Sequence, residues 1–447
     1  MSFATARALD PAQRRVVGAE PSRSLLVLGA AGSGKTTAAL HRLAAVARAV
    51  GPDLRALVLV PTPGLAARCR RAVAAARLPA EVHPLDAWLG RQARRAFGGL
   101  DPRDSEDVPP AVPRVKRHPA VADVLALLDP QVPDDTVRDD LYELWGDASL
   151  LAELADAADG ALSEADLARV RAHAEVQFAP VERDDDGRPL RGMDGVPLHH
   201  GTALNDALTL DVEDYPLLFA LDRLRGGRRR PTRYHHVVLD EAQELAPLEL
   251  ALLGRAVGRG GALTVVGDAG QQIDPTAWFA GWEASLAALG RPADRLTLTA
   301  SHRCPPAVLA LAQAIRDRRP APDGVVRVLA ASAADHDDAL AAWLAPGPAP
   351  TAVVAADATL ACALHASLPR ALGARLAVGR GEVDAPLVVT SADRLRGLDL
   401  ARVAVPELDP ARWPDTAEAR GALYVAVTRA AREVWLGSVG RWSPLLG

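Results

Sequence analysis

Residues 25–40 read LLVLGAAGSGKTTAAL, and this stretch decides the fold. Its first four residues are apolar and predict a short buried strand, while the residues from Lys35 onward predict a helix. The connection between them, Gly29 to Thr36, fits the pattern G-x-x-x-x-G-K-[ST]. Glycines in such a loop let backbone N–H groups curl around phosphates, and the following helix N-terminus adds free donors and a favourable dipole. The stretch therefore predicts a phosphate-binding loop between a strand and a helix.

Two side chains of this loop have expected chemical roles. Lys35 is placed to neutralise the β- and γ-phosphates of ATP, and the Thr36 hydroxyl to ligate Mg²⁺. The alternative is a glycine-rich turn that binds nothing, but the flanking strand and helix favour the nucleotide site. The residues expected to surround ATP here are Gly29, Ala30, Ala31, Gly32, Ser33, Gly34, Lys35, Thr36 and Thr37.

A second signal lies about 200 residues downstream, where residues 237–243 read VVLDEAQ. An apolar strand delivers two acids at its C-terminal end, which is where open α/β sheets bind ligands. We expect Asp240 to hold Mg²⁺ and Glu241 to polarise the attacking water as a general base. An acidic pair after a strand can also cap a helix. Its pairing with a phosphate loop upstream favours the catalytic interpretation.

Short apolar runs alternate with helical stretches along both halves of the chain. This alternation predicts α/β domains with parallel sheets. The expected strands are 25–28, 56–60, 236–239 and 263–266 in the first half, and 325–329, 352–355, 387–390, 403–406 and 434–436 in the second.

The character of the sequence changes after residue 97, where proline-rich and acidic helical stretches replace the alternation. We therefore predict a first domain formed by residues 1–97 and 206–290, interrupted by a mostly helical insertion at 98–205. Residues 291–447 form the second domain.

The chain of 447 residues has a net charge of −5, so its overall charge does not indicate nucleic acid. Local arginine clusters could still form a strand-binding groove, although solvated helix faces are the alternative. The clusters are Arg68, Arg70 and Arg71; Arg91, Arg94 and Arg95; and Arg223 to Arg233. Lysine occurs only at positions 35 and 116.

The cysteines, Cys69, Cys304 and Cys362, are few and widely spaced, which fits a reducing compartment. The first ten residues lack an apolar signal core, and no stretch is long and apolar enough to span a bilayer. We expect a cytoplasmic protein without a membrane partner.

Further motifs follow one another in a fixed order, and with the two above the chain resembles superfamily-one helicases of the UvrD/Rep type. The motifs are LDPAQ (9–13), LVPT (59–62), DEAQ (240–243), VGDAGQ (266–271), SHRCP (301–305), RGLD (396–399) and LYVAVTRA (423–430). The resemblance implies two RecA-like domains with ATP between them. It also implies that Gln13 reads adenine, Gln271 senses the γ-phosphate, and Arg303 and Arg429 act as arginine fingers.

Some positions depart from the family pattern. Thr37 replaces an arginine beside adenine, and His302 replaces a tyrosine, although imidazole can still stack on a base. In the stretch that resembles KGLE, Gly397 and Asp399 would approach the nucleotide, with Asp399 in place of glutamate.

The nucleic-acid contacts implied by the resemblance are Thr62, His83 and a ring near Trp278. Asp274 and Pro275 stand where a tyrosine and a glycine normally precede a strand-stacking tryptophan. Trp278, Phe279 or Trp282 would take over base stacking, or these rings belong to the core.

Only about 85 residues separate Arg303 from Thr390, so we expect this chain to lack the large insertion that UvrD-type relatives carry at this point. Residues 211–270 also have some likeness to the HelD-like branch, which acts on RNA polymerase, but the long helical arm of that branch is missing here.

Three functions remain. The first is an ATP-driven motor on single-stranded nucleic acid; the resemblance implies movement 3′ to 5′ and favours DNA, but the sequence itself does not distinguish DNA from RNA. The second is an ATPase switch or accessory subunit that acts on a partner nuclease or RNA polymerase. The third is a degenerate scaffold, which the intact Lys35, Glu241 and Arg429 disfavour. The sequence leaves the oligomeric state open.

Overall fold

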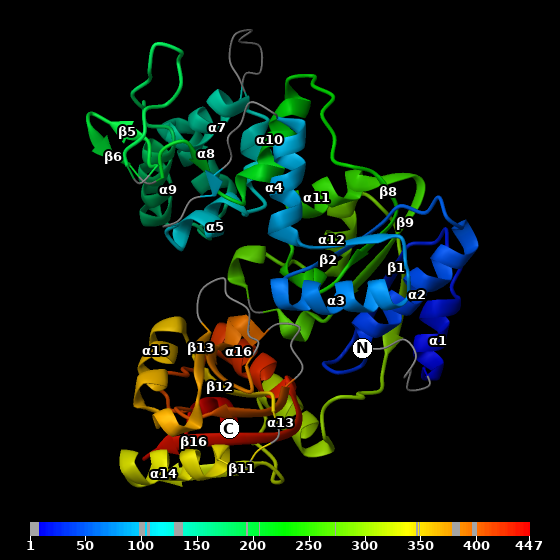
Figure 1. The fold of residues 1–447 in the computed structure, drawn as a ribbon, viewed down its shortest axis with the longest axis vertical. Helices are drawn as coiled ribbons and strands as arrows, with labels where there is room; N and C mark the ends of the chain where they lie inside the picture. Colours follow the sequence, from blue (N-terminus) through cyan, green and yellow to red (C-terminus); the bar gives the residue numbers. More distant parts are fainter. Residues whose placement is uncertain are drawn as a thin grey trace.

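The fold was obtained as a computed structural model. It describes residues 9–97, 103–104, 108–128, 137–193, 195–204, 206–272, 274–345, 347, 349–377, 385–395 and 400–447. Two α/β domains lie one above the other, and a group of helices gathers at the far end of the first domain (Figure 1). Each domain contains a six-stranded sheet in which all pairings between neighbouring strands are parallel. The predicted fold class, two parallel-sheet α/β domains, is confirmed.

The first sheet has the strand order β10-β1-β9-β8-β2-β3. Its apolar runs are continuous because helices cover both faces: Leu25 and Val27 pack into one core, and Leu26 between them packs into the other. The strands are β1 (Leu25–Gly29), β2 (Ala56–Val60), β3 (Ala80–Pro84), β8 (Tyr234–Leu239), β9 (Val257–Gly267) and β10 (Asp294–Leu298).

Two helical layers enclose this sheet. One layer is α1 (Pro11–Gly18), α2 (Lys35–Val50) and α3 (Pro63–Ala75). The other is α4 (Leu85–Ala96), α10 (Asp214–Leu224), α11 (Pro247–Ala256) and α12 (Trp282–Leu289). The second layer shares one continuous core with the inserted helices, so the insertion is packed onto the domain.

Among the described residues, five helices follow α4 within 98–205, the range proposed from the sequence as an insertion. They are α5 (Ala111–Lys116), α6 (Val121–Leu125), α7 (Val137–Gly146), α8 (Ala148–Ala157) and α9 (Glu164–Gln177). Two short ladders accompany them, one joining β4 (Arg103–Asp104) to β7 (Thr209–Leu210) and one joining β5 (Leu198–His199) to β6 (Thr202–Ala203).

A buried ion cluster ties the insertion to α10. The Lys116 ammonium is fully buried and donates to Asp211 at 2.7 Å and to Asp214 at 2.8 Å. Trp145 Nε1 donates to the same Asp214 carboxylate at 3.2 Å. The two carboxylates offset the desolvation of the ammonium, and the pKa of Lys116 is raised even though burial alone would lower it.

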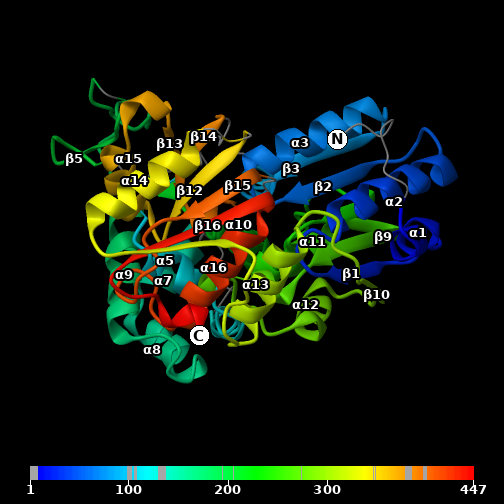
Figure 2. The ribbon, with the colours of Figure 1, turned by 90° about the horizontal axis from the view of Figure 1, so that it is seen from below.

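The second sheet has the order β11-β16-β15-β12-β14-β13. Helices α14 and α15 lie on one side of it and α13 and α16 on the other (Figure 2). The strands are β11 (Val326–Ala330), β12 (Thr351–Ala355), β13 (Arg375–Ala377), β14 (Leu387–Ser391), β15 (Leu400–Val405) and β16 (Ala430–Val439). The helices are α13 (Pro306–Arg316), α14 (Ala333–Leu344), α15 (Ala358–Ser367) and α16 (Ala417–Thr428).

The elements assigned between Arg303 and Thr390, where the described residues run with short gaps, all belong to this second domain. All three cysteines are free. Across the described ranges, no helix combines the length and apolarity needed to cross a bilayer.

Candidate nucleotide-binding site

The phosphate loop follows the C-terminal end of β1 and leads into α2. Gly32 and Gly34 both have left-handed backbone, with φ of +74° and +79°. A Cβ at Gly32 would lie 2.7 Å from Arg303 Cβ, and a Cβ at Gly34 would lie 2.4 Å from Gln13 Nε2. Backbone conformation and close neighbours therefore both require glycine at these two positions.

The two reactive side chains of the loop, Lys35 and Thr36, have different hydrogen-bond partners. Lys35 is buried, and its ammonium donates to the carbonyl oxygens of Gly29 at 2.7 Å and Ala30 at 3.3 Å. Thr36 Oγ1 donates to Asp240 Oδ2 at 2.7 Å. The loop and the DEAQ motif, about 200 residues apart in sequence, thus meet at one edge of the sheet, as predicted for parallel strands.

The two adjacent acids have opposite pKa shifts. Burial raises the pKa of Asp240 to about 6, and the neighbouring Glu241 charge adds to the effect. Burial would also raise the pKa of Glu241, but the Lys35 and Arg429 charges outweigh burial and lower it. Gln243 Nε2 donates to Glu241 Oε2 at 2.9 Å, which fixes the carboxylate in its ionised form. An ionised, oriented carboxylate is what a water-activating base requires.

The N-terminal motif reaches the same loop through Gln13. Gln13 Nε2 donates to the Ser33 carbonyl at 3.0 Å, and Asp10 caps α1 through the Gln13 backbone N–H at 2.8 Å. The other Asp10 oxygen lies 2.8 Å from His302 Nε2. The His302 backbone N–H in turn donates to Gly32 O at 2.8 Å. His302 is therefore held beside the loop from two sides.

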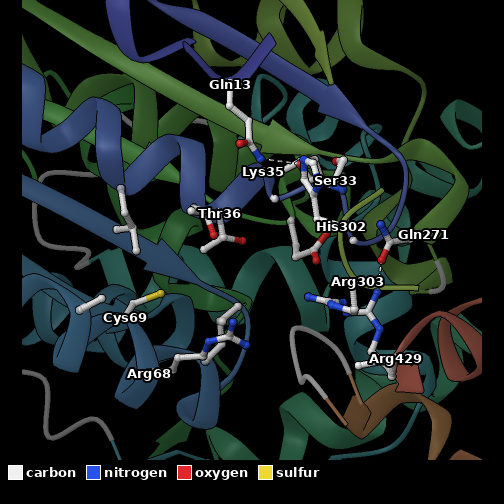
Figure 3. A pocket seen from close by; sticks show the side chains of 18 of the residues that line it. Gln13, Ser33, Lys35, Thr36, Arg68, Cys69, Gln271, His302, Arg303 and Arg429 are labelled. Carbon is white, nitrogen blue, oxygen red and sulfur yellow. Dashed lines mark hydrogen bonds between the residues drawn. The ribbon is translucent and has the colours of Figure 1, made fainter. Parts of the chain in front are cut away.

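The second domain contributes two arginines. Arg303 lines the pocket beside Gly32, and Arg429 is 2% exposed and donates a short hydrogen bond to Gln271 Oε1. Gln271 Nε2 donates to Asp268 Oδ2 at 2.8 Å, so the amide joins the two domains. Figure 3 shows Lys35 and Thr36 on one side of the pocket, with Arg303 and Arg429 approaching from the other.

Most of the predicted site residues line one cavity of about 480 Å³, a size typical of small-molecule sites. They are Gln13, Gly32, Ser33, Gly34, Lys35, Thr36, Thr37, Glu241, Gln271, His302, Arg303 and Arg429. Asp240, which accepts the hydrogen bond from Thr36, does not line the cavity.

Part of the cavity wall comes from α3, through Leu65, Arg68, Cys69 and Ala72, which the sequence analysis did not assign to the site. Figure 3 shows Arg68 on the wall opposite Arg303. The spacing i, i+3, i+4, i+7 places the four residues on one helix face, and this periodicity was the available signal.

The donor set fits a nucleotide with Mg²⁺. Ser33 Oγ is buried, and no hydrogen bond among the described residues reaches it, so it is an oriented hydroxyl for a phosphate. Thr36 and Asp240 offer the oxygen ligands that Mg²⁺ prefers, and Mg²⁺ usually takes only one or two protein ligands beside phosphates. In keeping with such a sparse site, no group of three or more His, Cys, Asp or Glu within the described ranges could hold a metal.

The predicted nucleic-acid contacts lie outside this cavity. Thr62 caps α3, with Oγ1 accepting from Leu65 N at 3.3 Å. His83 lies between Glu81 and Arg91, at 3.3 Å and 2.8 Å. Both stay predictions. Thr37 lines the cavity, whereas Gly397 and Asp399 lie outside the described residues.

The candidate stacking rings are engaged in packing. Trp278 Nε1 donates to Arg114 O at 2.8 Å, and its ring meets His118 edge-on with centroids 4.2 Å apart. Trp282 is 8% exposed and packs against Phe279. In this conformation these rings belong to the packing between the first domain and the insertion, which is the second of the two alternatives left open above.

A second, acidic cavity lies next to Thr62, one of the residues expected to contact a single strand. Its volume is about 420 Å³, and it lies beside Pro61 at the end of β2. Its charged lining residues are Asp86, Arg117, Asp211, Glu213, Glu244, Glu249 and Asp274. Arg117 is itself paired with Glu249 at 3.0 Å and with Asp274 at 2.9 Å. Burial raises the pKa of Glu213 to about 8.

Two of the solved structures that match this chain are distant from it in sequence. The C-terminal domain of a possible DNA helicase from Lactobacillus plantarum WCFS1 is 24% identical over 33% of this chain and 93% of that one, with a TM-score of 0.29. S. cerevisiae Dbp5, solved bound to RNA and ADP BeF3, is 12% identical over 97% of this chain and 84% of that one, with a TM-score of 0.43. No curated protein matches significantly.

The family model AAA_19, described as an AAA domain, matches residues 13–276. The match begins at Gln13 and contains the phosphate loop, the DEAQ motif and Gln271. More than half of the chain is therefore a P-loop NTPase domain, and the chain belongs to the AAA domain family represented by AAA_19.

Proposed function

We propose that the protein is an ATP-driven nucleic-acid motor that hydrolyses ATP in the cleft between its two α/β domains. The observation that carries the proposal is the contact of Arg429 in the second domain with Gln271 in the first, beside the phosphate loop. Arg303 and His302 approach the same loop through Gly32. A site divided in this way works only when the domains close, so each ATP cycle changes their separation.

Each residue has a role in this mechanism. Lys35 exchanges its loop carbonyl partners for the β- and γ-phosphates, and Glu241 orients and deprotonates the attacking water. Thr36 and Asp240 would hold Mg²⁺, which would supply positive charge to the phosphate oxygens. Gln13 and His302 position the adenine.

The arginines complete the site in the transition state. Arg303 and Arg429 stabilise the charge that develops on the transferred phosphoryl group, an effect worth roughly 10³–10⁵ in rate for arginine fingers. Arg429 also lowers the pKa of Glu241, which keeps the base ionised. Closure therefore assembles both the electrostatic stabilisation and the base.

The nucleic acid in this proposal is a single strand, DNA rather than RNA, that contacts Thr62 and His83 and is moved 3′ to 5′. The support is the ordered set of motifs that resembles UvrD/Rep helicases. The site of action is the reducing cytoplasm, which agrees with the three free cysteines.

The test is steady-state ATP hydrolysis with and without single-stranded DNA or RNA. We expect hydrolysis by the wild type to rise several-fold with a single strand, and Lys35→Ala to abolish hydrolysis in either condition. Lys116→Ala is unsuitable as a control because Lys116 is buried in an ion cluster; Arg48→Ala, on the exposed end of α2, is suitable. Wild-type turnover by Lys35→Ala would refute the assignment.

One observation favours a second candidate, an ATPase switch that acts on a partner nuclease or RNA polymerase. The acidic cavity beside Pro61 repels phosphates at a point where a strand-translocating protein needs to attract them. If single strands do not stimulate hydrolysis and a partner protein does, the switch replaces the motor.

A further inference from the structure

Arginines from three separate segments meet at the edge of the first sheet opposite the ATP cavity. The segments are the C-terminal end of α4, the connection from α10 to β8, and the end of α11. The connection precedes β8, whereas Asp240 follows β8. The N-terminal and C-terminal ends of the strands are therefore separated by the length of a six-residue strand, roughly 20 Å. Figure 1 shows this connection near the top of the molecule, with the second domain at the bottom.

Hydrogen bonds hold the three segments together. Arg95 donates a short hydrogen bond to Thr232 Oγ1, and Arg229 Nε donates to Ala96 O at 3.1 Å, so the connection is tied to α4. Arg255 Nη2 donates to Arg229 O at 3.0 Å, which ties it to α11. The surface is therefore a built structure and not a set of unrelated side chains.

Four arginines of this surface have no side-chain partner. They are Arg223, Arg228, Arg230 and Arg233, all exposed, and none of their guanidinium groups makes a hydrogen bond or ion pair with any described residue. Two carboxylates that the connection contacts, Asp222 and Asp140, are buried and are already paired with Arg229 and Arg225, respectively. Three of the four lie in the connection and not on a helix, so a helix dipole does not account for them.

The repulsion between these charges is visible at Arg255. Burial lowers the pKa of Arg255, and the Arg223, Arg230 and Arg233 charges lower it further. Because like charges repel, gathering these cations lowers the stability of the folded protein. A solvated helix face has no need to gather cations in this way. The acidic cavity lies at the opposite end of the same domain, beside Pro61 at the end of β2. Positive charge therefore gathers at one end of the first domain and negative charge at the other.

We propose that this arginine surface, defined by Arg223, Arg228, Arg230 and Arg233, binds the phosphate backbone of a nucleic-acid duplex. Unpartnered guanidinium groups on an open surface match regularly spaced phosphates and read no sequence. Single-strand sites combine positive charge with aromatic platforms. Here the nearest rings are buried: Phe97 lies under Arg229, 5.1 Å from its guanidinium carbon, and Tyr234 is 2% exposed.

The test is binding of a fluorescein-labelled 20-base-pair DNA duplex, measured by anisotropy between 50 and 200 mM NaCl without nucleotide. The salt slope of log affinity is about −0.9 per phosphate contact, so four contacts account for a fall on the order of 10²-fold over this fourfold change in salt. We expect that part of the salt dependence to disappear in the test variant, with basal ATP hydrolysis unchanged and a melting temperature equal to or above that of the wild type, because the repulsion between the arginines is removed. The variant is R223Q/R228Q/R230Q/R233Q.

A matched control removes the same charge from the insertion. Its four arginines are also exposed, but three of them surround the acidic stretch 184–186. The control variant is R169Q/R183Q/R188Q/R191Q, and we expect it to bind the duplex like the wild type. If the quadruple variant does not fold, the double variant R228Q/R230Q removes two of the four proposed contacts. It should then lose about half of the part of the salt slope that is attributed to the four arginines.

The proposal is overturned if the test variant keeps the wild-type affinity and slope, or if the control loses as much. It is also overturned if only single strands lose affinity, or if the wild type binds acidic polypeptides such as polyglutamate as tightly as the duplex. Because no ATP is present, these outcomes are independent of whether the protein translocates.

Discussion

Replacing Gly34 by alanine tests how the phosphate loop and the N-terminal motif depend on one another. Gly34 has φ +79° and ψ 28°, and a left-handed alanine costs about 1–2 kcal/mol. The new Cβ would lie 2.4 Å from Gln13 Nε2, so Gln13 has to move and its 3.0 Å hydrogen bond to Ser33 O is lost, at about 1 kcal/mol. We expect Gly34→Ala to destabilise the protein by about 2–3 kcal/mol.

Gly290 provides the matched control. It has the same left-handed backbone, φ +63° and ψ 28°, and nothing lies within 4 Å of its Cβ position. Gly290→Ala should therefore lose only the backbone contribution of about 1–2 kcal/mol and bind nucleotide normally. Gly34→Ala should bind a fluorescent ATP analogue about tenfold or more weakly, which corresponds to about 1.4 kcal/mol.

A double-mutant cycle identifies the cause. If the clash with Gln13 is responsible, Gln13→Ala should remove part of the penalty of Gly34→Ala, with a coupling free energy of about 1 kcal/mol by thermal melting and by nucleotide titration. Strictly additive effects of the two substitutions would refute the reasoning, because they would show that Gln13 does not limit the space at residue 34.

Three further outcomes are expected. Arg303→Ala should lower kcat for ATP by about 10³-fold or more while changing the nucleotide Kd less than tenfold, and an equal loss in both would contradict a transition-state role. The pKa of Glu213 is about 8 in the folded protein and near 4.5 when unfolded, so its contribution to stability is present at low pH and lost as pH rises toward 8. Glu213→Gln should therefore raise stability at pH 9 by up to about 4–5 kcal/mol and leave pH 4 unchanged, as followed by melting temperature. Trp278→Leu removes the 2.8 Å hydrogen bond to Arg114 O and should lower the melting temperature without weakening single-strand binding; the reverse pattern would restore Trp278 as a stacking ring.

All nine runs that the sequence predicted coincide with strands of the two six-stranded sheets. Eight of them are interior strands, and an interior strand covered on both faces is apolar throughout. The ninth, β11, is an edge strand whose first four residues are exposed or half-buried, but its sequence VRVLA is still mostly apolar. Three strands of these two sheets were missed: β3, β10 and β13. Each is an edge strand of its sheet and carries polar or charged residues, as in the run Asp294–Leu298. Their sequences therefore give no continuous apolar signal.

The candidate site was predictable where backbone geometry dictates the residue type. The phosphate loop and the DEAQ motif are recognisable because glycine, lysine and acids are needed at fixed positions after strands. The contribution of Arg68 on α3 was not assigned, since one arginine on an amphipathic helix is indistinguishable from a solvated one. The acidic cavity depends on residues from the start of α4, the segment before α10, α11 and the segment after β9, which only the tertiary structure brings together.

The packing of Lys116 gives the protein a built-in chemical reporter. The whole chain has only two lysines, and the Lys116 amine is enclosed by Asp211 and Asp214, out of reach of an acylating reagent. Apart from the α-amino group, the remaining amine is Lys35 in the nucleotide cavity. Mass spectrometry after brief acylation would therefore count occupied cavities directly, with no substitution or label added to the protein.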